Sequence, residues 1–291
     1  MVAGEIVPLK AAALPLSDSA IFYGDALFET VRVEGGVAVA LGPHIERLYD
    51  ACRSIALPPA YSMQALEQAA LALLRHAAWS TGVLRILLSR TAPLGPSPIA
   101  PLPAEGAGHA VLTLTPLPAP DPRLWRTGLR LACVALPVTP ALGQLKSSSY
   151  LPQFWARRQA EAAGADDALV LDADGQVREG ASSNLFVWRQ GRVWTPPLSC
   201  GALPGVTRAV VLKLAAAEGF SVRAQVLYPH DLYSAEEVWL TSSIRELAPA
   251  CCIDGVRIGT GVPGPVARAL QRRYRAWIAT TPAPASHSHA R

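Results

Sequence analysis

The sequence has very few lysines, and this scarcity draws attention to those that remain. Of 26 basic residues in a chain of 291, only three are lysines and the remaining 23 are arginines. Arginine stays protonated in proteins, whereas a desolvated lysine can lose its proton and attack a carbonyl carbon. Lys10 lies near the chain start, and Lys213 lies in a predicted helix. Lys146 follows an apolar run and is either a surface residue in a serine-rich loop or a lysine kept for its chemistry.

Cysteine pairs and long apolar runs are also missing. The five cysteines are odd in number and form no Cys-x-x-Cys pair, which argues against both a zinc site and a disulfide framework. Reduced thiols in a cytoplasmic protein are expected instead. No run of 18 uninterrupted apolar residues occurs, so no transmembrane helix is expected. Residues 1–16 contain Glu5 and Lys10 and lack a basic start, so no signal peptide is expected.

The low aromatic content and the scattered charge argue against nucleic-acid binding. Aromatic residues make up 7% of the chain, the net charge is +4, and no arginine-rich tract or RNA-binding motif is present. Hydrophobic residues make up 51% and charged residues 16%, which predicts a globular chain. The length suits one large domain or two modest ones.

Residues 1–117 are predicted to form a small N-terminal α+β domain. Strand, turn and helix signals alternate along it. The expected elements are a strand at 26–33, a turn at 34–36, a strand at 37–41, a helix from Pro43, a helix at 62–78, and strands at 83–89 and 110–115. Residues 91–105 carry five prolines and are expected to form a loop, and whether it acts as a lid is left open. The Pro-rich stretch 116–122 marks the domain boundary.

Residues 118–278 are predicted to form a larger second domain, followed by a disordered tail at 279–291. Its expected strands are 129–138, 168–172, 176–179, 184–188, 192–195, 237–241 and 247–253. Its expected helices are 151–163, 206–218 and 264–277. Because the strands cluster and the helices stand apart from them, the pattern favours an α+β protein over a regular βαβ array.

Three further features could join Lys146 in one site. The loop 201–207 enters a helix, and a helix start with its unpaired N–H groups suits a phosphate. Thr241-Ser242-Ser243 places small donors at a strand end, and Glu179 could lie beside a cationic ring nitrogen. Each feature alone fits an ordinary loop, turn or exposed carboxylate. Together, a lysine, a phosphate-binding helix start and a carboxylate are the parts that a pyridoxal phosphate site requires.

The order of these strings resembles the fold-type IV pyridoxal-phosphate enzymes, also called class IV aminotransferases. This family includes branched-chain and D-amino-acid aminotransferases and 4-amino-4-deoxychorismate lyase. The similarity runs from about residue 17 to about residue 264. The strings that carry it are 22–30 (FYGDALFET), 44–48 (HIERL), 145–147 (LKS), 174–186 (DGQVREGASSNLF), 195–196 (TP), 203–208 (LPGVTR) and 241–243 (TSS). The resemblance implies a small N-terminal domain, a larger barrel-like C-terminal domain and a homodimer.

The resemblance also implies a role for each matching residue. Lys146 is similar to the lysine that bonds covalently to the cofactor, and Glu179 to the partner of the pyridine nitrogen. The other matching positions are the phosphate arginine Arg47, the phosphate donors Val206 and Thr207, and Thr241 with Ser242, where phosphate or a substrate carboxylate is held. Thr30 is a candidate proton relay, although a strand threonine is more often structural.

The sequence leaves three functions open, and the lyase is preferred among them. Lys146-Ser147 followed by Tyr150-Leu151-Pro152 is more similar to the lyase and D-amino-acid branches than to branched-chain enzymes. No histidine follows Arg90 as an Arg-x-His substrate trap, which argues against the D-amino-acid branch. Thr91, where the lyase branch has glycine, and Ser149, where asparagine is common, put chorismate recognition in doubt. The alternatives are an aminotransferase for branched-chain or D-amino acids with 2-oxoglutarate, and a pyridoxal-phosphate-binding protein without turnover. Each function implies a small-molecule amine as ligand.

Overall fold

The computed structural model describes residues 1–2, 4–90 and 108–281, which fall into two compact units. The first unit comprises Met1–Pro118, Lys146–Ser149 and Trp277–Arg291, and the second comprises Ala119–Leu145 and Tyr150–Ala276. The predicted proline-rich loop at 91–105 lies outside the described residues. The segment that carries Lys146 therefore belongs to the N-terminal unit, although the chain on both sides of it belongs to the other.

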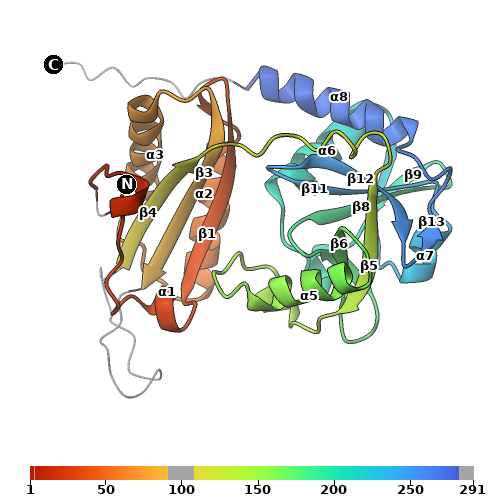
Figure 1. Ribbon diagram of the computed structural model, residues 1–291, viewed down its shortest axis with the longest axis horizontal. Coiled ribbons are helices and arrows are strands. Elements are labelled where there is room, and N and C mark those ends of the chain that lie inside the picture. The colour runs from red at the N-terminus through yellow and green to blue at the C-terminus, as the bar shows by residue number, and fades with distance from the viewer. Residues whose placement is uncertain (3, 91–107, 282–291) are drawn as a thin grey trace. The chain divides into compact units, whose positions relative to one another are not determined.

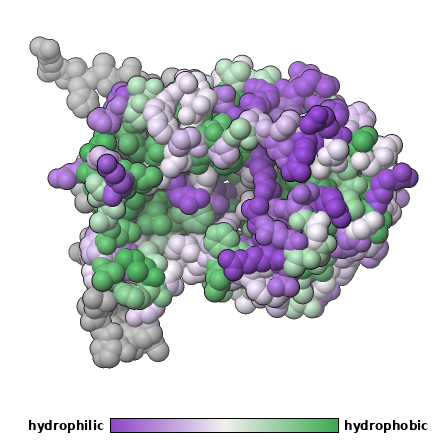
Figure 2. Space-filling model, viewed as in Figure 1, coloured by the Kyte–Doolittle hydropathy of each residue, from purple (hydrophilic) through white to green (hydrophobic). Residues whose placement is uncertain are grey.

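The first unit is a four-stranded antiparallel sheet with helices behind it (Figure 1). Its strand order is β2-β1-β3-β4. The strands are β1 (Ala26–Glu34), β2 (Val37–Ala38), β3 (Thr81–Arg90) and β4 (Gly108–Thr115), and the main helices are α2 (Leu41–Ser54) and α3 (Met63–Ala77). Alternate strand residues such as Leu27, Leu84 and Leu112 are fully buried, as the period of two in a strand requires. In Figure 2 the sheet face turned to the viewer is mostly apolar.

The N-terminal elements differ from the prediction around residue 40. The returning strand β2 has only two residues, because Ala40 adopts a left-handed conformation with φ of 54° and α2 begins directly after it. Pro43 is the third residue of α2 rather than its first, a position that tolerates proline because the first four N–H groups of a helix have no intrahelical acceptor. The 3-10 helix η1 (Leu9–Ala11) and the short helix α1 (Ser19–Phe22) were not predicted.

The second unit contains a nine-stranded mixed sheet. Its order is β10-β9-β8-β11-β12-β5-β6-β7, and β13 pairs with β12. The strands are β5 (Leu129–Ala135), β6 (Asp167–Leu171), β7 (Val177–Gly180), β8 (Asn184–Arg189), β9 (Arg192–Thr195), β10 (Ser221–Ala224), β11 (Glu237–Ser242), β12 (Glu246–Ile253) and β13 (Val256–Arg257). Its helices are α4 (Pro140–Gly143), α5 (Leu151–Ala162), η2 (Leu198–Cys200), α6 (Val206–Ala217), α7 (Pro229–Tyr233) and α8 (Pro265–Ala279), the last of which ends in the first unit.

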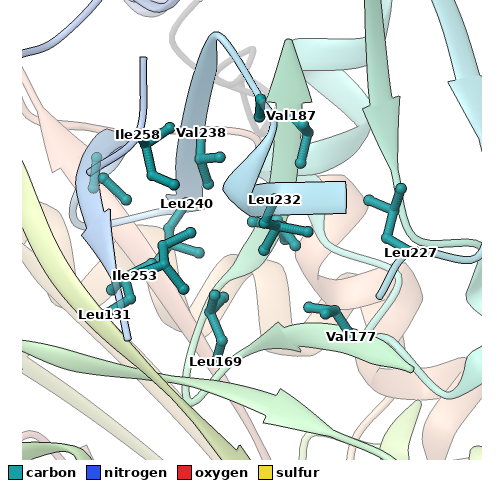
Figure 3. Close-up of a cluster of buried hydrophobic side chains, with 14 residues drawn as sticks. Leu131, Leu169, Val177, Val187, Leu227, Leu232, Val238, Leu240, Ile253 and Ile258 are labelled. Atoms are coloured by element: carbon teal, nitrogen blue, oxygen red, sulfur yellow. The ribbon is translucent and has the colours of Figure 1, made fainter. Parts of the chain in front are cut away.

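This sheet curls until its two ends meet, which agrees with the barrel-like expectation. Val177 in β7 donates its N–H to the carbonyl of Leu227, three residues beyond β10, at 2.7 Å. The interior is a cluster of fully buried aliphatic side chains (Figure 3), among them Leu169, Val187 and Leu240. Burial of apolar side chains, worth about 2 kcal/mol at each such position, makes this cluster the main source of stability in the unit.

Parallel strand pairs were not expected, yet the second unit contains three. β5 and β6 are parallel and are joined through α5, while β9 and β10 are parallel and are joined through α6. β12 also pairs with β5 in parallel. Parallel neighbours need a crossover connection, and a helix usually supplies it. The fold class remains mixed α and β, with two βαβ crossovers embedded in an otherwise antiparallel sheet.

The C-terminal tail was predicted to begin at residue 279, but Ala279 is the last residue of α8. Residues 282–291 lie outside the described residues. Within the described part of the chain, no helix is long and apolar enough to cross a membrane. Across the same residues, no three His, Cys, Asp or Glu side chains gather as metal ligands. The five cysteines are all free thiols.

The buried aliphatic cluster yields a stability prediction. Leu240 is completely buried, so Leu240→Ala is expected to lower the free energy of unfolding by about 2–5 kcal/mol through lost contacts and a residual cavity. Chemical denaturation followed by circular dichroism measures this loss. Leu16→Ala is the matched control, because Leu16 is 67% exposed and its truncation should change stability by less than about 0.5 kcal/mol. Equal losses for the two variants would contradict the packing described here.

Candidate active site

Lys146 is fixed by its backbone to the edge of β1. The N–H of Phe28 donates to the carbonyl of Lys146 at 2.9 Å, and the N–H of Ser148 donates to the carbonyl of Ala26 at 2.8 Å. Leu27 and Ser147 form an antiparallel bridge between these two bonds. The serine-rich segment is therefore a short extra strand on the sheet and not a free surface loop.

Two serine hydroxyls fasten the same segment to the turn before β1. Ser148 Oγ and Ser149 Oγ donate to the carbonyl of Gly24 at 3.0 and 3.1 Å. Gly24 has a φ of +63°, and a Cβ at this position would collide with Ser149 Oγ. Glycine is thus required twice at this position, for its backbone conformation and for the close approach of the lysine segment.

The Lys146 side chain lies over an aromatic ring that it shares with an arginine. Lys146 Nζ is 4.4 Å from the ring centroid of Phe28, and Arg85 Cζ is 5.4 Å from the same centroid. Thr30, the candidate proton relay, stands directly opposite Arg85 in the β1–β3 register and shares its sheet face. Two cations near one ring make this part of the face suited to an anionic ligand.

A buried cluster of charged side chains joins β1 to α2. The Glu29 carboxylate is 1% exposed and accepts from Arg47 Nε at 2.8 Å and from Arg47 Nη2 at 2.7 Å. His44 Nδ1 lies 2.7 Å from Glu29 Oε2. His44 and Arg47 are three residues apart, so they lie on one face of α2. The paired bonds fix the plane of the guanidinium, because a fork of two parallel bonds leaves it no rotational freedom.

The protonation states in this cluster follow from burial and from the pairing. Burial alone would raise the pKa of Glu29, but hydrogen bonds from His44 and Arg47 and their charges lower it to about 2. Burial lowers the pKa of His44 below its usual value, outweighing the opposing effect of the Glu29 bond. The cluster at neutral pH therefore consists of a carboxylate, a guanidinium and a neutral imidazole.

In the second unit, Glu179 accepts hydrogen bonds from a side chain and from the backbone. Asn184 Nδ2 donates to Glu179 Oε2 at 3.2 Å, and the backbone N–H of Leu203 donates to the same oxygen at 3.0 Å. Asn184 Nδ2 also donates to the Leu203 carbonyl at 2.8 Å, which ties the amide to the same loop. A carboxylate held by fixed donors points its oxygens in one direction.

Helix α6 begins beside this carboxylate loop. Gly205 is its N-cap residue, and no side chain among the described residues caps the helix start. A Cβ on Gly205 would collide with Asn184 Oδ1, so the helix start lies against the amide that orients Glu179. Val206 and Thr207 are its first two residues, and Thr207 is buried. Their N–H groups belong to the four that a helix leaves without an intrahelical partner.

Thr241 and Ser242 end strand β11. Thr241 is 2% exposed, and its Oγ1 has no hydrogen-bond partner within the described part of the chain. Thr241 stands opposite Asn184 in the β11–β8 register, so both side chains leave the sheet on one face. The turn that follows is fastened by Arg245, whose guanidinium pairs with the buried Asp167 carboxylate. A buried hydroxyl without a partner is unusual in a native fold and suits a ligand acceptor.

The predicted residues thus fall into two groups. Lys146, Thr30 and Arg47 belong to the first unit, and the others belong to the second: Glu179, Val206, Thr207, Thr241 and Ser242. Sequence reasoning missed the residues that orient them. Glu29 and His44 stand in the quoted strings, and the spacing of His44 and Arg47 on one helix face was the available signal. The backbone N–H of Leu203 left no signal in the sequence at all.

This donor set fits a phosphorylated pyridine. Glu179 can face a ring nitrogen that carries a proton, and a helix start with a close-packed glycine suits a phosphate. The Thr241 hydroxyl supplies a further donor that no described residue of the protein uses. The residues present in each unit are therefore compatible with such a cofactor.

The fold and these residue groups define a two-unit α+β enzyme of the fold-type IV class. The family model described as "Amino-transferase class IV" matches residues 26–253, and the chain belongs to this family. The branched-chain-amino-acid aminotransferase of Escherichia coli is 29% identical to this chain, over 93% of this chain and 90% of its own length. A crystal structure of the E. coli branched-chain aminotransferase has a TM-score of 0.89 at 27% identity, covering 95% of this chain and 93% of the other.

Two further solved structures bear on the choice of reaction. A branched-chain aminotransferase from the bacterium abbreviated T.th., complexed with N-(5'-phosphopyridoxyl)-L-glutamate, has a TM-score of 0.86 at 29% identity, covering 95% of this chain and 92% of the other. The 4-amino-4-deoxychorismate lyase of Pseudomonas aeruginosa has a TM-score of 0.80 at 31% identity, covering 95% and 98%. The relatives therefore include both reactions that the sequence left open.

The buried Glu29 cluster predicts that acid destabilises the fold. An unfolded histidine has a pKa of about 6.5 and an unfolded glutamate about 4.3, and both values are lower in the folded protein. The unfolded chain therefore binds protons first as pH falls. Stability should decrease below about pH 6.5 through His44, and again below about pH 4.3 through Glu29.

His44→Asn is expected to flatten the first of these losses, because an amide can replace the Nδ1–H donor without titrating. Urea denaturation at several pH values between 5 and 8 measures the slope. His230→Asn is the control, since the His230 side chain is 75% exposed. An unchanged slope in His44→Asn, or an equal change in both variants, would rule out His44 as the titrating group.

Proposed function

We propose that the protein is a pyridoxal-phosphate-dependent aminotransferase that acts on branched-chain amino acids with 2-oxoglutarate as amino acceptor. The observation that carries this proposal is the fixed position of Lys146, whose backbone is bonded into the edge of β1 within a class IV aminotransferase fold. The names of the relatives favour this alternative over the lyase that the sequence alone preferred.

In the proposed reaction, Lys146 attaches the cofactor and then moves a proton at the α-carbon of the substrate. The aromatic ring of Phe28 limits where Nζ can lie, because the ammonium rests over its face. Pyridoxal phosphate, when bound, supplies an electron-withdrawing ring that stabilises negative charge at the α-carbon. Thr30, on the same sheet face as Phe28, is a candidate for relaying that proton.

The remaining residues hold the cofactor in the proposed site. Glu179 keeps the ring nitrogen protonated, and the donors from Asn184 and Leu203 keep the carboxylate pointed toward it. Val206 and Thr207 bind the phosphate through N–H groups at the start of α6. Arg47 adds a cation whose orientation Glu29 fixes, and Thr241 with Ser242 binds the phosphate or the substrate carboxylate.

The second candidate function is 4-amino-4-deoxychorismate lyase. The observation that favours it is the P. aeruginosa lyase, which matches 95% of this chain at 31% identity. Both reactions begin with proton removal by the same lysine and differ in which bond breaks next. In the lyase, pyruvate leaves and the ring becomes 4-aminobenzoate. In the aminotransferase, a keto acid leaves and the amino group stays on the cofactor until 2-oxoglutarate accepts it.

A paired assay separates the candidates. The purified protein is incubated with leucine and 2-oxoglutarate, and separately with aminodeoxychorismate. We expect glutamate to form in the first reaction and no aminobenzoate in the second. Aminobenzoate without glutamate would reverse the assignment. Visible absorbance without either product would favour a binding protein that does not turn over.

Lys146→Ala is the decisive variant for both candidates. Loss of the attaching amine should abolish visible absorbance from a covalently held cofactor, and loss of the proton carrier should lower turnover by at least about 10²-fold. Lys213→Ala is the matched control, since Lys213 lies exposed on α6. A yellow, active Lys146→Ala protein would be incompatible with the proposed role.

We also propose that two copies of the chain associate. Helix α5 exposes Leu151, Phe154 and Trp155 at 75%, 56% and 47% of their surface. The Phe154 ring packs edge-on against Tyr150, with centroids 5.6 Å apart, which holds part of this face in one conformation. An exposed cluster of large apolar side chains is typical of a protein interface.

Substitution on this face tests the association. Trp155→Glu should convert a dimer into a monomer, because an unpaired carboxylate would be buried in the interface. Light scattering coupled to size-exclusion chromatography measures the mass. Trp79→Glu is the control, since Trp79 is 39% exposed in the other unit. A monomeric unsubstituted protein, or a Trp155→Glu protein that remains dimeric, would count against this interface.

A further inference from the structure

Two segments far apart in sequence meet backbone to backbone in the second unit. Helix α4, which precedes the Lys146 segment, lies against the turn at Gly201 that follows η2. A Cβ on Gly143 would collide with the Gly201 carbonyl oxygen, and a Cβ on Gly201 would lie 2.8 Å from Pro140 Cα. Real Cβ atoms do not approach backbone this closely, so both positions depend on glycine.

A side-chain hydrogen bond secures this contact. Gln144 Nε2 donates to the carbonyl of Leu198 at 2.7 Å. Gln144 is the residue directly after α4, and Leu198 is the first residue of η2. The amide is partly buried, so the bond competes with water only in part. The bond holds η2 at a fixed distance from the end of α4.

Arg178 lies beneath the two glycines. It is 3% exposed, and its Nη1 donates a long bond of 3.4 Å to the Val138 carbonyl. A Cβ on Gly143 would be 3.2 Å from Arg178 Nη1, and a Cβ on Gly201 would be 3.5 Å from Arg178 Cδ. Arg178 also precedes Glu179 in β7. The turn at Gly201 is therefore supported by the strand neighbour of the carboxylate.

The same turn leads to the donor that orients Glu179. Leu203 stands two residues after Gly201, and its N–H donates to Glu179 Oε2 at 3.0 Å. Asn184 binds the Leu203 carbonyl from the other side. The path from Leu198 through Gly201 to Leu203 is short and has few freely rotating bonds, because Pro197 and Pro204 flank it.

We propose that Gln144 is a positioning residue for Glu179. By holding η2 against α4, it keeps the Leu203 N–H directed at Glu179 Oε2 and so fixes the carboxylate for a ring nitrogen. This inference rests on the proposed function for the identity of that ring. Loss of the Gln144 bond loosens the loop that carries the Leu203 donor, so cofactor binding weakens and the carboxylate orientation varies.

Gln144→Met tests the proposal, since methionine has the length of glutamine but no N–H donor. Hydrogen exchange of the full-length protein, without added cofactor, is followed by mass spectrometry on peptides that cover 198–205. One hydrogen bond corresponds to about twofold to tenfold faster exchange in these peptides. Titration with pyridoxal 5'-phosphate should give a dissociation constant raised by a similar factor. Gln225→Met, at an exposed glutamine of the same unit, should change neither measurement.

Unchanged exchange at 198–205 in Gln144→Met would overturn the proposal. Faster exchange with an unchanged dissociation constant would also overturn it, because the loop would then not act through Glu179. Failure of the unsubstituted protein to bind pyridoxal 5'-phosphate would instead refute the proposed function, while the exchange comparison would still report on the contact. Gln144→Lys, which restores an N–H donor, should return exchange toward that of the unsubstituted protein.

The glycine contact provides an independent arm. Gly143→Ala should accelerate exchange at 198–205, because its Cβ would push the Gly201 carbonyl away. Gly42→Ala is the matched control, since a Cβ at Gly42 meets no atom of the described residues within 4 Å. Equal exchange at 198–205 in the two alanine variants would contradict the coupling between α4 and this turn.

Discussion

The pairing of residues 146–148 with the edge of β1 is the constraint on which the candidate site depends. Two backbone hydrogen bonds, Phe28 to Lys146 and Ser148 to Ala26, fix the lysine main chain on a rigid sheet. A flexible four-carbon side chain then reaches only the region over the Phe28 ring. A nucleophile on a free loop would lose this restriction, and an effective concentration near the reacting carbon would be lost with it.

Charge in both units is arranged before any ligand arrives. Glu29 holds the Arg47 guanidinium through a fork of two bonds, and the low pKa of Glu29 keeps that pair ionised. Glu179 receives donors from Asn184 and Leu203, so its carboxylate is directed as well. Preorganised groups need not reorient during reaction, which is the main electrostatic advantage of an enzyme over water.

The sequence predicted most long elements because periodicity and glycine or proline signals mark them locally. It failed where a tertiary contact decides the outcome. The strand at 37–41 shrank to two residues because Ala40 turns left-handed, and β10 was missed because it is a short exposed edge that pairs only through the α6 crossover. In the site, motif order located Lys146 and Glu179. No local pattern could reveal that Lys146 joins β1 or that a backbone N–H of Leu203 orients Glu179, because both contacts join residues distant in sequence.

The central claim is that Lys146, and neither of the other two lysines, carries the cofactor. Reduction of the protein with borohydride in the presence of pyridoxal 5'-phosphate traps the cofactor on whichever lysine holds it, and peptide mass spectrometry locates the added mass. The account predicts a phosphopyridoxyl group on the peptide that contains Lys146. A label confined to Lys10 or Lys213, or no label under conditions where the protein is folded, would contradict it.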